Sequence, residues 1–334
     1  VFERGGRGWF LFRYRGHSDR DAPRRLDEYA ALGEEPPEEE EVAEEEIQRG
    51  GVLRVAMEAD GDGINPVANN FANSAYLMGQ SIFDPLFTLD QNGDWFPYLA
   101  ESASPVEGTN SWQITLRQGV TYHDGSEMTA DDMIAAFEAQ LADPIISLAV
   151  APSFPAENRV EKIDDYTVQY NLLRPSAHFP TNLTSQLGMV PSASYIAAAA
   201  EDPTMDQMPI GQGPFKIVSR TQDDKTVVER FDGYWQGTDN IYLDGIEFSP
   251  ITDTAIASER VAAGDIDLVV TSGPDAILTL RDADSVNTIE NLYSGENDIM
   301  MNTRAAPFDD IRARQALTYA ADRESQKYTY CRAS

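Results

Sequence analysis

The chain has 334 residues, of which 42% are hydrophobic, enough for two domains or one large domain with a substantial core. Its formal net charge of −31 excludes a general affinity for nucleic acid or anionic lipid, because both would be repelled. Such a surface favours solubility or adaptation to brine. Cys331 is the single cysteine, so no internal disulfide and no cysteine-based metal cluster can form.

Residues 1–50 do not resemble a folded domain. The first 25 residues are basic, and residues 26–48 form a dense acidic run whose like charges repel one another. The apolar patch WFLF at 9–12 is too short for the core of a secretory signal. We expect a disordered, charged N-terminal segment or linker and no signal peptide in this chain.

Order is expected to begin at Gly50-Gly51 with a strand over residues 52–60. This strand runs into the loop GDGINPVANNFAN, and a strand that ends in such a loop often faces a cleft. The DGDGIN stretch superficially resembles a calcium loop. It has Ile64 and Phe71 where two ligands would be needed, so we expect no metal there.

Further strands are predicted along the chain, at residues 111–116, 167–172, 225–231 and 246–251. A helix is predicted to start at Thr129, where Asp131 and Asp132 suit its positive end and Thr129 with Asp132 approximates a capping box. His123 lies in the turn before this helix, beside Asp124. A histidine next to carboxylates could be a general base or a metal ligand, but no second histidine lies at ligand spacing, which favours a structural turn.

A helix is predicted over residues 252–263, ending at Gly264, and DIDLVV at 265–270 is predicted to be a buried strand. Strand, helix and strand within about 25 residues form a βαβ unit. The chain is therefore expected to have a mixed α/β architecture.

Four stretches in the same order resemble the family 5 extracytoplasmic solute-binding proteins of ABC importers, the dipeptide-, oligopeptide- and nickel-binding group. The most specific is WQITLRQGVTYHDGSEMTADDMIAAF, which follows the family pattern LRxGVxFHDGxPxTADDV. The others lie at 82–102, at 211–218 with FDGYW at 231–235, and at 302–324. Small departures occur, with Tyr122 in place of Phe, Glu127 in place of Pro and Gln212 in place of Thr.

The resemblance implies an α/β, periplasmic-binding-protein-like two-lobe fold of class II. Residues 51–301 would form lobe one, with an inserted subdomain at roughly 82–210, and residues 302–324 would begin the second lobe. Residues 325–334 do not resemble the family and form an aberrant tail. We therefore expect a truncated or frameshifted sequence in which the second lobe is largely missing.

The implied function is the substrate-binding component of an ABC-type importer, which captures a peptide or similar small solute and delivers it to a membrane permease. Two lobes would close over the solute without breaking a bond, so no enzyme activity and no cofactor are expected. Alternatives are a hydrolase that uses His123 and nearby carboxylates, a structural or adhesive surface protein, and a binder of a nickel complex, sugar or haem. No G-x-S-x-G nucleophile motif supports the hydrolase.

The resemblance also implies a position for the solute, in segments where an extended peptide could pair as an added strand. The predicted ligand-binding residues are Glu58, Ala59, Asp60, Thr271, Ser272, Gly273, Pro274, Tyr293, Gly295, Asn297 and Asp298. The alternative is that Tyr293 is a core aromatic residue and that 272–274 is a plain turn. His178 and Trp235 are expected to be structural, and a monomer outside the cytoplasm is expected for the full-length protein.

The last predicted element is a helix over residues 309–321, which Asp309 or Asp310 can cap. Its apolar stripe would be Ile311, Ala313, Leu317 and Ala320. If the partners of this stripe are missing, the helix should fray or drive association, and solute should bind this chain no more tightly than about 1 mM, or about 4 kcal/mol.

Overall fold

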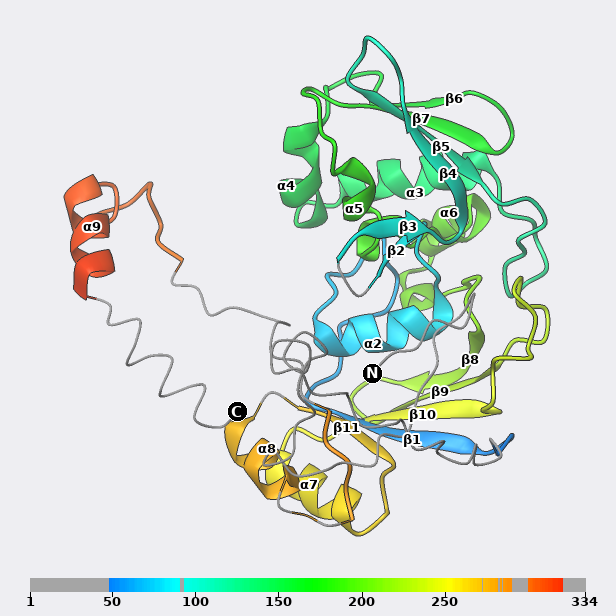
Figure 1. The fold of residues 1–334 in the computed structure, drawn as a ribbon, viewed down its shortest axis with the longest axis vertical. Coiled ribbons are helices and arrows are strands. Elements are labelled where there is room, and N and C mark those ends of the chain that lie inside the picture. The colour runs from blue at the N-terminus through cyan, green and yellow to red at the C-terminus, as the bar shows by residue number, and fades with distance from the viewer. Residues whose placement is uncertain are drawn as a thin grey trace, which may run out of the picture. The chain divides into compact units, whose positions relative to one another are not determined.

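A computed structural model describes residues 48–90, 93–271, 273–281, 283, 285–289 and 300–320 (Figure 1). These residues fall into two compact units. The first unit contains residues 48–252 and 266–270, and the second contains residues 253–265 and the described residues from 271 onward. The expected disorder of residues 1–50 concerns segments that lie almost wholly outside the described residues.

A five-stranded mixed sheet forms one part of the first unit. Its strands, in the order in which they pair, are β11 (Leu268–Val270), β1 (Val52–Met57), β10 (Gly245–Pro250), β9 (Lys225–Arg230) and β8 (Phe215–Thr221). β1 is parallel to both β10 and β11, whereas β9 is antiparallel to β10 and to β8. The connection from β10 to β11 thus joins parallel strands, as the predicted βαβ unit requires.

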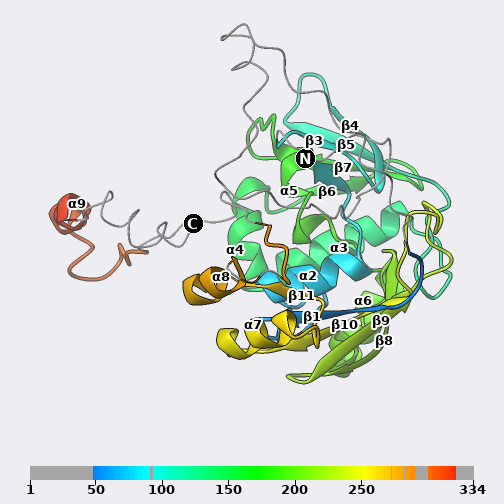
Figure 2. The same ribbon diagram turned by 60° about the horizontal axis from the view of Figure 1, so that its bottom comes forward.

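Helix α2 (Asn73–Ile82) lies along this sheet in both ribbon views (Figures 1 and 2). Burial alternates along β9: Thr226 and Val228 are buried, Val227 between them is only partly buried, and the charged residues Lys225, Glu229 and Arg230 lie at the two ends of the strand. Sheet and helix enclose a core cluster of buried residues, made of Val55, Met57, Ile64, Phe71, Ala75, Met78, Ile82, Phe83, Met189, Phe215, Val228, Tyr234, Ile241 and Phe248.

An antiparallel four-stranded sheet forms the other part of the first unit. Its strands pair in the order β4 (Ala100–Pro105), β5 (Ser111–Leu116), β7 (Thr167–Asn171) and β6 (Val160–Lys162). A separate pair, β2 (Phe87–Leu89) and β3 (Trp95–Pro97), is antiparallel. Helix α3 (Ala130–Ala142) and this sheet contribute to a second core that includes Ile114, Tyr122, Phe137 and Tyr170. All these elements lie within residues 82–210, although the predicted domain boundaries remain a prediction.

The start of α3 confirms the predicted capping box. The Asp132 carboxylate accepts hydrogen bonds from the backbone N–H of Thr129, at 2.7 Å, and from its hydroxyl, at 3.1 Å. Its other oxygen accepts from the backbone N–H of Ala193, at 2.8 Å, at the first residue of α6 (Ala193–Glu201). Asp132 is buried, so one carboxylate satisfies donors at two helix N-termini.

The remaining short helices of the first unit are α4 (Ile146–Val150), η2 (Ala151–Ser153), α5 (Phe179–Asn182), η3 (Gln186–Gly188) and η4 (Pro203–Gln207). No single helix in the described part of the chain is long and apolar enough to cross a membrane. Within the same described residues, one bent pair of helices, α3 together with residues 146–153, has the length and apolar composition of a membrane span.

The second unit contains three helices among its described residues: α7 (Thr254–Ala262), α8 (Pro274–Arg281) and α9 (Ile311–Ala320). Asp253 caps α7 by accepting from the N–H groups of Ala255 and Ile256. Gly264 has φ +79°, the left-handed conformation predicted for the residue that ends this helix.

Two strand predictions need correction. The first strand ends at Met57 rather than at residue 60, because Asp60 is drawn into local hydrogen bonds with the loop that follows. The last strand covers only 268–270 and is not buried, since Leu268 and Val270 are 37% and 46% exposed. β11 is the edge strand of its sheet and has β1 as its only partner among the described strands.

Candidate solute-binding site

The carboxyl ends of two adjacent parallel strands lie level with each other. β1 ends at Met57 and β11 ends at Val270, and these two residues are partners in the register. Glu58 and Ala59 follow β1, with Glu58 partly buried and Ala59 exposed. In open α/β sheets, ligands bind beyond the carboxyl ends of the strands. Glu58 and Ala59 therefore occupy the type of position predicted for ligand contacts.

Thr271 follows β11 directly, and its hydroxyl oxygen accepts a hydrogen bond from the backbone N–H of Gly273 at 3.1 Å. Pro274 is the first residue of α8, although its side chain lies outside the described part of the structure. The other predicted ligand residues also lie outside the described residues: Ser272, Tyr293, Gly295, Asn297 and Asp298. Their roles, and those of Thr271, Gly273 and Pro274, stay predictions.

The third residue after β1, Asp60, has a buried side chain. Its carboxylate is 4% exposed and pairs with the guanidinium of Arg220, which is fully buried, at 3.0 Å. Both carboxylate oxygens also accept backbone N–H groups, from Gly61 and from Asp223. In this structure the carboxylate of Asp60 is bound by partners within the protein. A contact between Asp60 and solute stays a prediction.

His123 holds the turn at 211–213. Its Nδ1 accepts the backbone N–H of Gly211 at 3.3 Å, and its Nε2 lies 3.1 Å from the carbonyl oxygen of Gly213, to which it donates. The backbone N–H of His123 donates to the carbonyl of Gly211. Burial lowers the pKa of His123 to about 4, although the bond to the Gly213 carbonyl acts in the opposite direction. The ring is therefore neutral at pH 7 and occupied by backbone groups.

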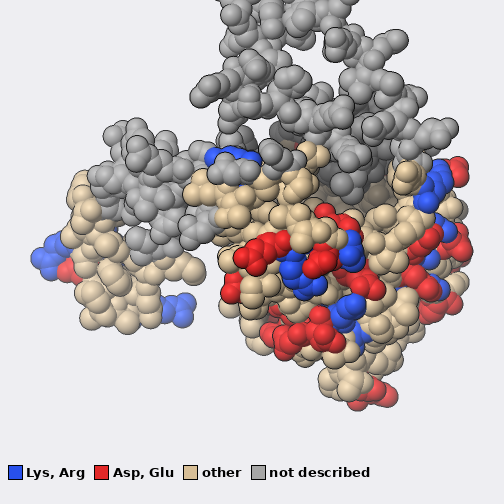
Figure 3. Space-filling view, turned by 90° about the horizontal axis from the view of Figure 1, so that it is seen from below, with Lys and Arg blue, Asp and Glu red and all other residues tan. Residues whose placement is uncertain are grey.

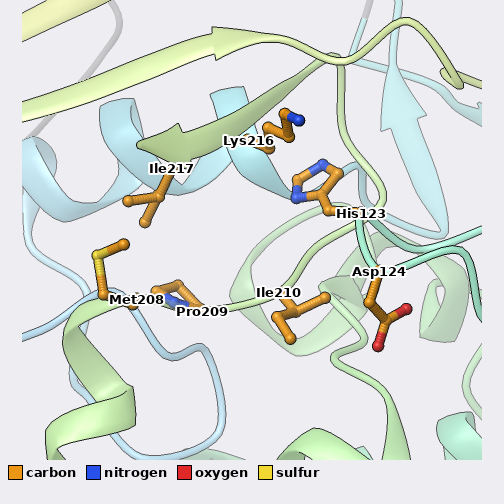
Figure 4. Close-up of a pocket in the computed structure, with 7 residues that line it drawn as sticks. All are labelled: His123, Asp124, Met208, Pro209, Ile210, Lys216 and Ile217. Carbon is orange, nitrogen blue, oxygen red and sulfur yellow. The ribbon is translucent and has the colours of Figure 1, made fainter. Parts of the chain in front are cut away.

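The neighbouring carboxylate of Asp124 is hydrogen-bonded within its own turn, and its charge acts only as a minor influence that raises the pKa of His123. One oxygen of Asp124 accepts hydrogen bonds from the backbone N–H and hydroxyl of Ser126, which closes the predicted turn. Figure 4 shows the side chains of His123 and Asp124 pointing in different directions around a cavity of about 220 Å³, with Lys216 beside the imidazole. In the described part of the chain, no three His, Cys, Asp or Glu residues could hold a metal ion.

The turn held by His123 packs directly on the end of α2. A Cβ on Gly211 would lie 2.1 Å from the carbonyl oxygen of Ile82, and one on Gly213 would lie 2.6 Å from the carbonyl carbon of Ile82. Only glycine permits this approach. The backbone N–H of Gly213 donates to the Ile82 carbonyl at 2.7 Å, and the buried Gln212 amide donates to the carbonyl of Asp84.

Asp84 is a buried carboxyl group that pattern analysis did not single out. Its Oδ2 accepts the hydroxyl of Tyr234 at 2.8 Å and the indole N–H of Trp235 at 2.7 Å. The Tyr234 hydroxyl also lies 3.1 Å from that of Tyr98. Burial raises the pKa of Asp84 to about 7, while the bonds from Trp235 and Tyr234 act to lower it. The aromatic residues of FDGYW were the only sequence signal for such a site.

These contacts join the two sheets of the first unit. Trp235 packs against both core clusters, and the guanidinium of Arg117 lies 5.5 Å from the centre of its ring. The structural role predicted for Trp235 is thus confirmed. His178 is exposed at the start of α5, so the structure gives it no comparable role. The stretches that carry the family resemblance at 82–84, 123–125, 211–213 and 231–235 meet at this one junction.

The surface of the five-stranded sheet carries paired charges. Figure 3 shows acidic side chains gathered on one face of the molecule, with basic side chains between them. Cross-strand ion pairs include Lys216 with Glu229 at 3.0 Å and Lys225 with Glu247 at 2.8 Å. Such exposed pairs contribute little to stability.

Solved structures share this arrangement of sheets and helices. An oligopeptide-binding protein, AppA, from Bacillus subtilis in complex with a nonapeptide superposes with a TM-score of 0.67 at 24% identity, covering 84% of this chain and 56% of that one. A dipeptide binding protein from Pseudoalteromonas sp. SM9913 in complex with Met-Leu gives 0.68 at 20% identity, covering 84% and 58%. The fold is that of the periplasmic binding proteins.

Residues 94–330 match the family model described as "Bacterial extracellular solute-binding proteins, family 5 Middle", and the chain belongs to this family. The Dipeptide-binding protein of Escherichia coli strain K12 is 29% identical over 250 residues, which are 69% of this chain and 46% of that protein. Heme-binding protein A of Haemophilus influenzae is 28% identical over 284 residues, 79% and 51% respectively. The chain thus spans about half the length of these relatives.

Proposed function

We propose that this chain is the substrate-binding component of an ABC-type importer and that its solute is a peptide or a similar small molecule. Family membership supports the solute-binding role, and the names of several relatives support the peptide. The full-length protein would act as a monomer outside the cytoplasm. There it would deliver the solute to a membrane permease.

The observation that carries this proposal is that the two adjacent parallel strands β1 and β11 end level with each other. The segments that follow, from Glu58 and from Thr271, begin where strands stop and ladder pairing ends. An extended peptide can pair with backbone groups of this kind as an added strand. Ala59 is exposed, so the backbone there is open to such an approach.

The proposal includes the absence of catalysis. His123 is the histidine that a hydrolase would need beside a carboxylate, yet both of its ring nitrogens engage backbone groups and Asp124 binds Ser126. A general base needs a free nitrogen within reach of the proton that it removes. We expect trialanine to remain intact during prolonged incubation with the protein. Hydrolysis that is lost on His123→Gln would contradict the proposal.

Binding can be tested by calorimetric titration of the chain with trialanine. We expect saturable binding in the millimolar range, about 4 kcal/mol, because the two strand-end segments supply only part of an enclosing site. Ala59→Trp places a bulky side chain beside the proposed strand-pairing segment and should weaken binding at least threefold. The matched control is Ala156→Trp, at another exposed alanine, which follows η2; this change should leave affinity unchanged.

The same titration distinguishes the solute classes. Some relatives are named for other cargo, such as haem and, in a solved structure from Campylobacter jejuni, Ni(L-His). Haemin and the nickel–histidine complex therefore serve as comparison ligands. Binding of either that exceeds trialanine binding and is lost in Ala59→Trp would replace the peptide by that solute. Failure of all three ligands to bind at 20 mM, or at their limit of solubility, would contradict the proposed function.

A further inference from the structure

Arg220 has the most completely buried charge in the described ion pairs. It projects from β8, and its side chain is fully buried. Its guanidinium lies within hydrogen-bonding distance of atoms of five residues: Asp60, Gly61, Met78, Gln207 and Thr226. These partners come from the loop after β1, from α2, from η4 and from β9. One side chain thus joins four elements around the exit of β1.

The pairing fixes backbone as well as side chains. Arg220 Nη2 donates to the carboxylate of Asp60 at 3.0 Å and to the carbonyl of Gly61 at 2.8 Å. Asp60 in turn accepts the N–H of Gly61, and its other oxygen accepts the N–H of Asp223 in the β8–β9 turn at 2.8 Å. The chain leaving β1 is therefore attached to the β8–β9 hairpin at several points.

A buried ion pair of this kind is not explained by stability alone. Taking two charges out of water costs much of what their attraction returns, and well-packed apolar residues often replace such pairs without loss of stability. What apolar residues cannot reproduce is the directional set of hydrogen bonds that selects one backbone arrangement. The effect of the Arg220–Asp60 pair should therefore fall on the conformation of the loop after β1.

We propose that Arg220 is a positioning residue for solute binding, acting through Asp60 to hold the segment Glu58–Asp60 in the conformation that receives the solute. This inference rests on the proposed function, because it assigns that segment to the solute site. Being fully buried, Arg220 does not itself touch solute. Its influence is transmitted by the backbone that it holds.

The positioning step can be measured without any ligand. In Arg220→Met, we expect hydrogen exchange of the Gly61 and Asp223 amides to accelerate at least tenfold, because both donate to a carboxylate that has lost its partner. The amide of Val228, in the middle of β9, serves as an internal reference and should change far less. The matched control is Lys225→Met, which removes an exposed ion pair from the same hairpin and should leave all three amides unchanged.

The consequence for binding is measured with trialanine. We expect Arg220→Met to weaken affinity at least threefold and Arg220→Lys to retain part of it, because lysine keeps the charge but lacks the planar fork of donors. Asp60→Asn should weaken affinity similarly, since it leaves the guanidinium without an anionic partner. Lys225→Met should bind as the unaltered chain does.

A double variant separates positioning from general stability. Arg220→Met with Asp60→Leu removes both charges, so its Tm should recover relative to Arg220→Met alone. We expect its Gly61 and Asp223 amides to remain fast and its affinity to remain low. A double variant that recovers affinity together with Tm would overturn the proposal, since stability would then account for the whole effect.

The two proposals fail in different ways. A chain that binds none of the ligands contradicts the proposed function and, with it, a role for Arg220 in solute binding. Binding by the unaltered chain, combined with unchanged exchange at Gly61 and Asp223 in the Arg220 variants, contradicts the positioning role alone.

Discussion

The imidazole of His123 accepts one backbone hydrogen bond and donates another, which only the neutral ring can do. Its pKa of about 4 in the folded protein lies below the ordinary value of 6.5. Between these values the unfolded chain binds the additional proton, so the stabilising contribution of His123 is complete above pH 6.5 and is lost as the pH falls towards 4.

We therefore expect the advantage of the unaltered chain over His123→Gln to shrink at low pH. The free energy of unfolding of the two proteins, measured by urea denaturation, should converge by on the order of 3 kcal/mol between pH 7 and pH 4. Taking the difference between the two proteins cancels the titration of the carboxylates, which both proteins contain. A difference that is constant across this range would show that the ring is not held neutral.

Asp84 should show the opposite dependence. Burial raises its pKa from 3.8 to about 7, so the folded protein favours the protonated acid. The contribution of this group is most favourable below pH 3.8 and is lost as the pH rises through 7. Asp84→Asn mimics the protonated acid, so its stability relative to the unaltered chain should rise by about 3 kcal/mol from pH 4 to pH 7. A relative stability that falls over this range would contradict the assignment.

For single residues, the sequence predicted that His123 lies in a turn, but it did not predict the backbone groups that the imidazole contacts. The assignment of His123 to a turn followed from local residue types, since Asp124 and Gly125 favour that geometry. Asp84 and its hydrogen-bond partner Tyr234 are 150 residues apart. Nothing local to the stretch IFDPL distinguishes a buried hydrogen-bonded acid from an exposed one, because its burial is decided by distant aromatic residues.

The N-terminus of α3 depends on one of two adjacent acids. Asp132 is buried and accepts bonds at two helix starts, whereas the Asp131 side chain is 65% exposed and pairs with Lys162. We expect Asp132→Ala to lower the free energy of unfolding by about 3 kcal/mol, through loss of the cap and unsatisfied backbone donors. Asp131→Ala should change it by less than about 0.5 kcal/mol. Equal effects in chemical denaturation would contradict this division.

Helix α9, unlike α3, has a capped start but no buried face. None of its residues is buried, and Ile311 is 57% exposed, although Asp310 accepts the N–H of Arg312 at the helix start as predicted. Packing of an apolar face, rather than capping, supplies most helix stability. Amides of α9 should therefore exchange at least a hundredfold faster than those in the middle of α3. Comparable protection would show that α9 is covered, for instance by association between chains.

Helices and strands were predictable where the signal lies within the segment itself. Predictions failed where burial depends on neighbouring strands that are distant in the sequence. The helix over 252–263 was recovered as α7, with Gly264 at its end, because capping residues and periodicity lie within the segment itself. Burial of DIDLVV was predicted wrongly. An apolar run does not reveal whether its strand lies in the centre of a sheet or, like β11, at the edge.

At the scale of the whole molecule, the family motifs serve the scaffold. His123, the glycine turn, Asp84 and the FDGYW segment meet between two sheets, whereas the predicted solute residues follow strand ends elsewhere in the chain. The family could therefore be predicted from sequence more securely than the solute.

The central claim is that solute contacts the segments that follow β1 and β11, and chemical-shift mapping during a trialanine titration tests it most directly. We predict that the largest backbone amide changes fall at Glu58, Ala59 and Thr271, with an apparent affinity in the millimolar range. Amides around His123 and Asp124, which line the cavity in Figure 4, should not move. Saturable shifts centred on that cavity, with Glu58, Ala59 and Thr271 unchanged, would contradict the account.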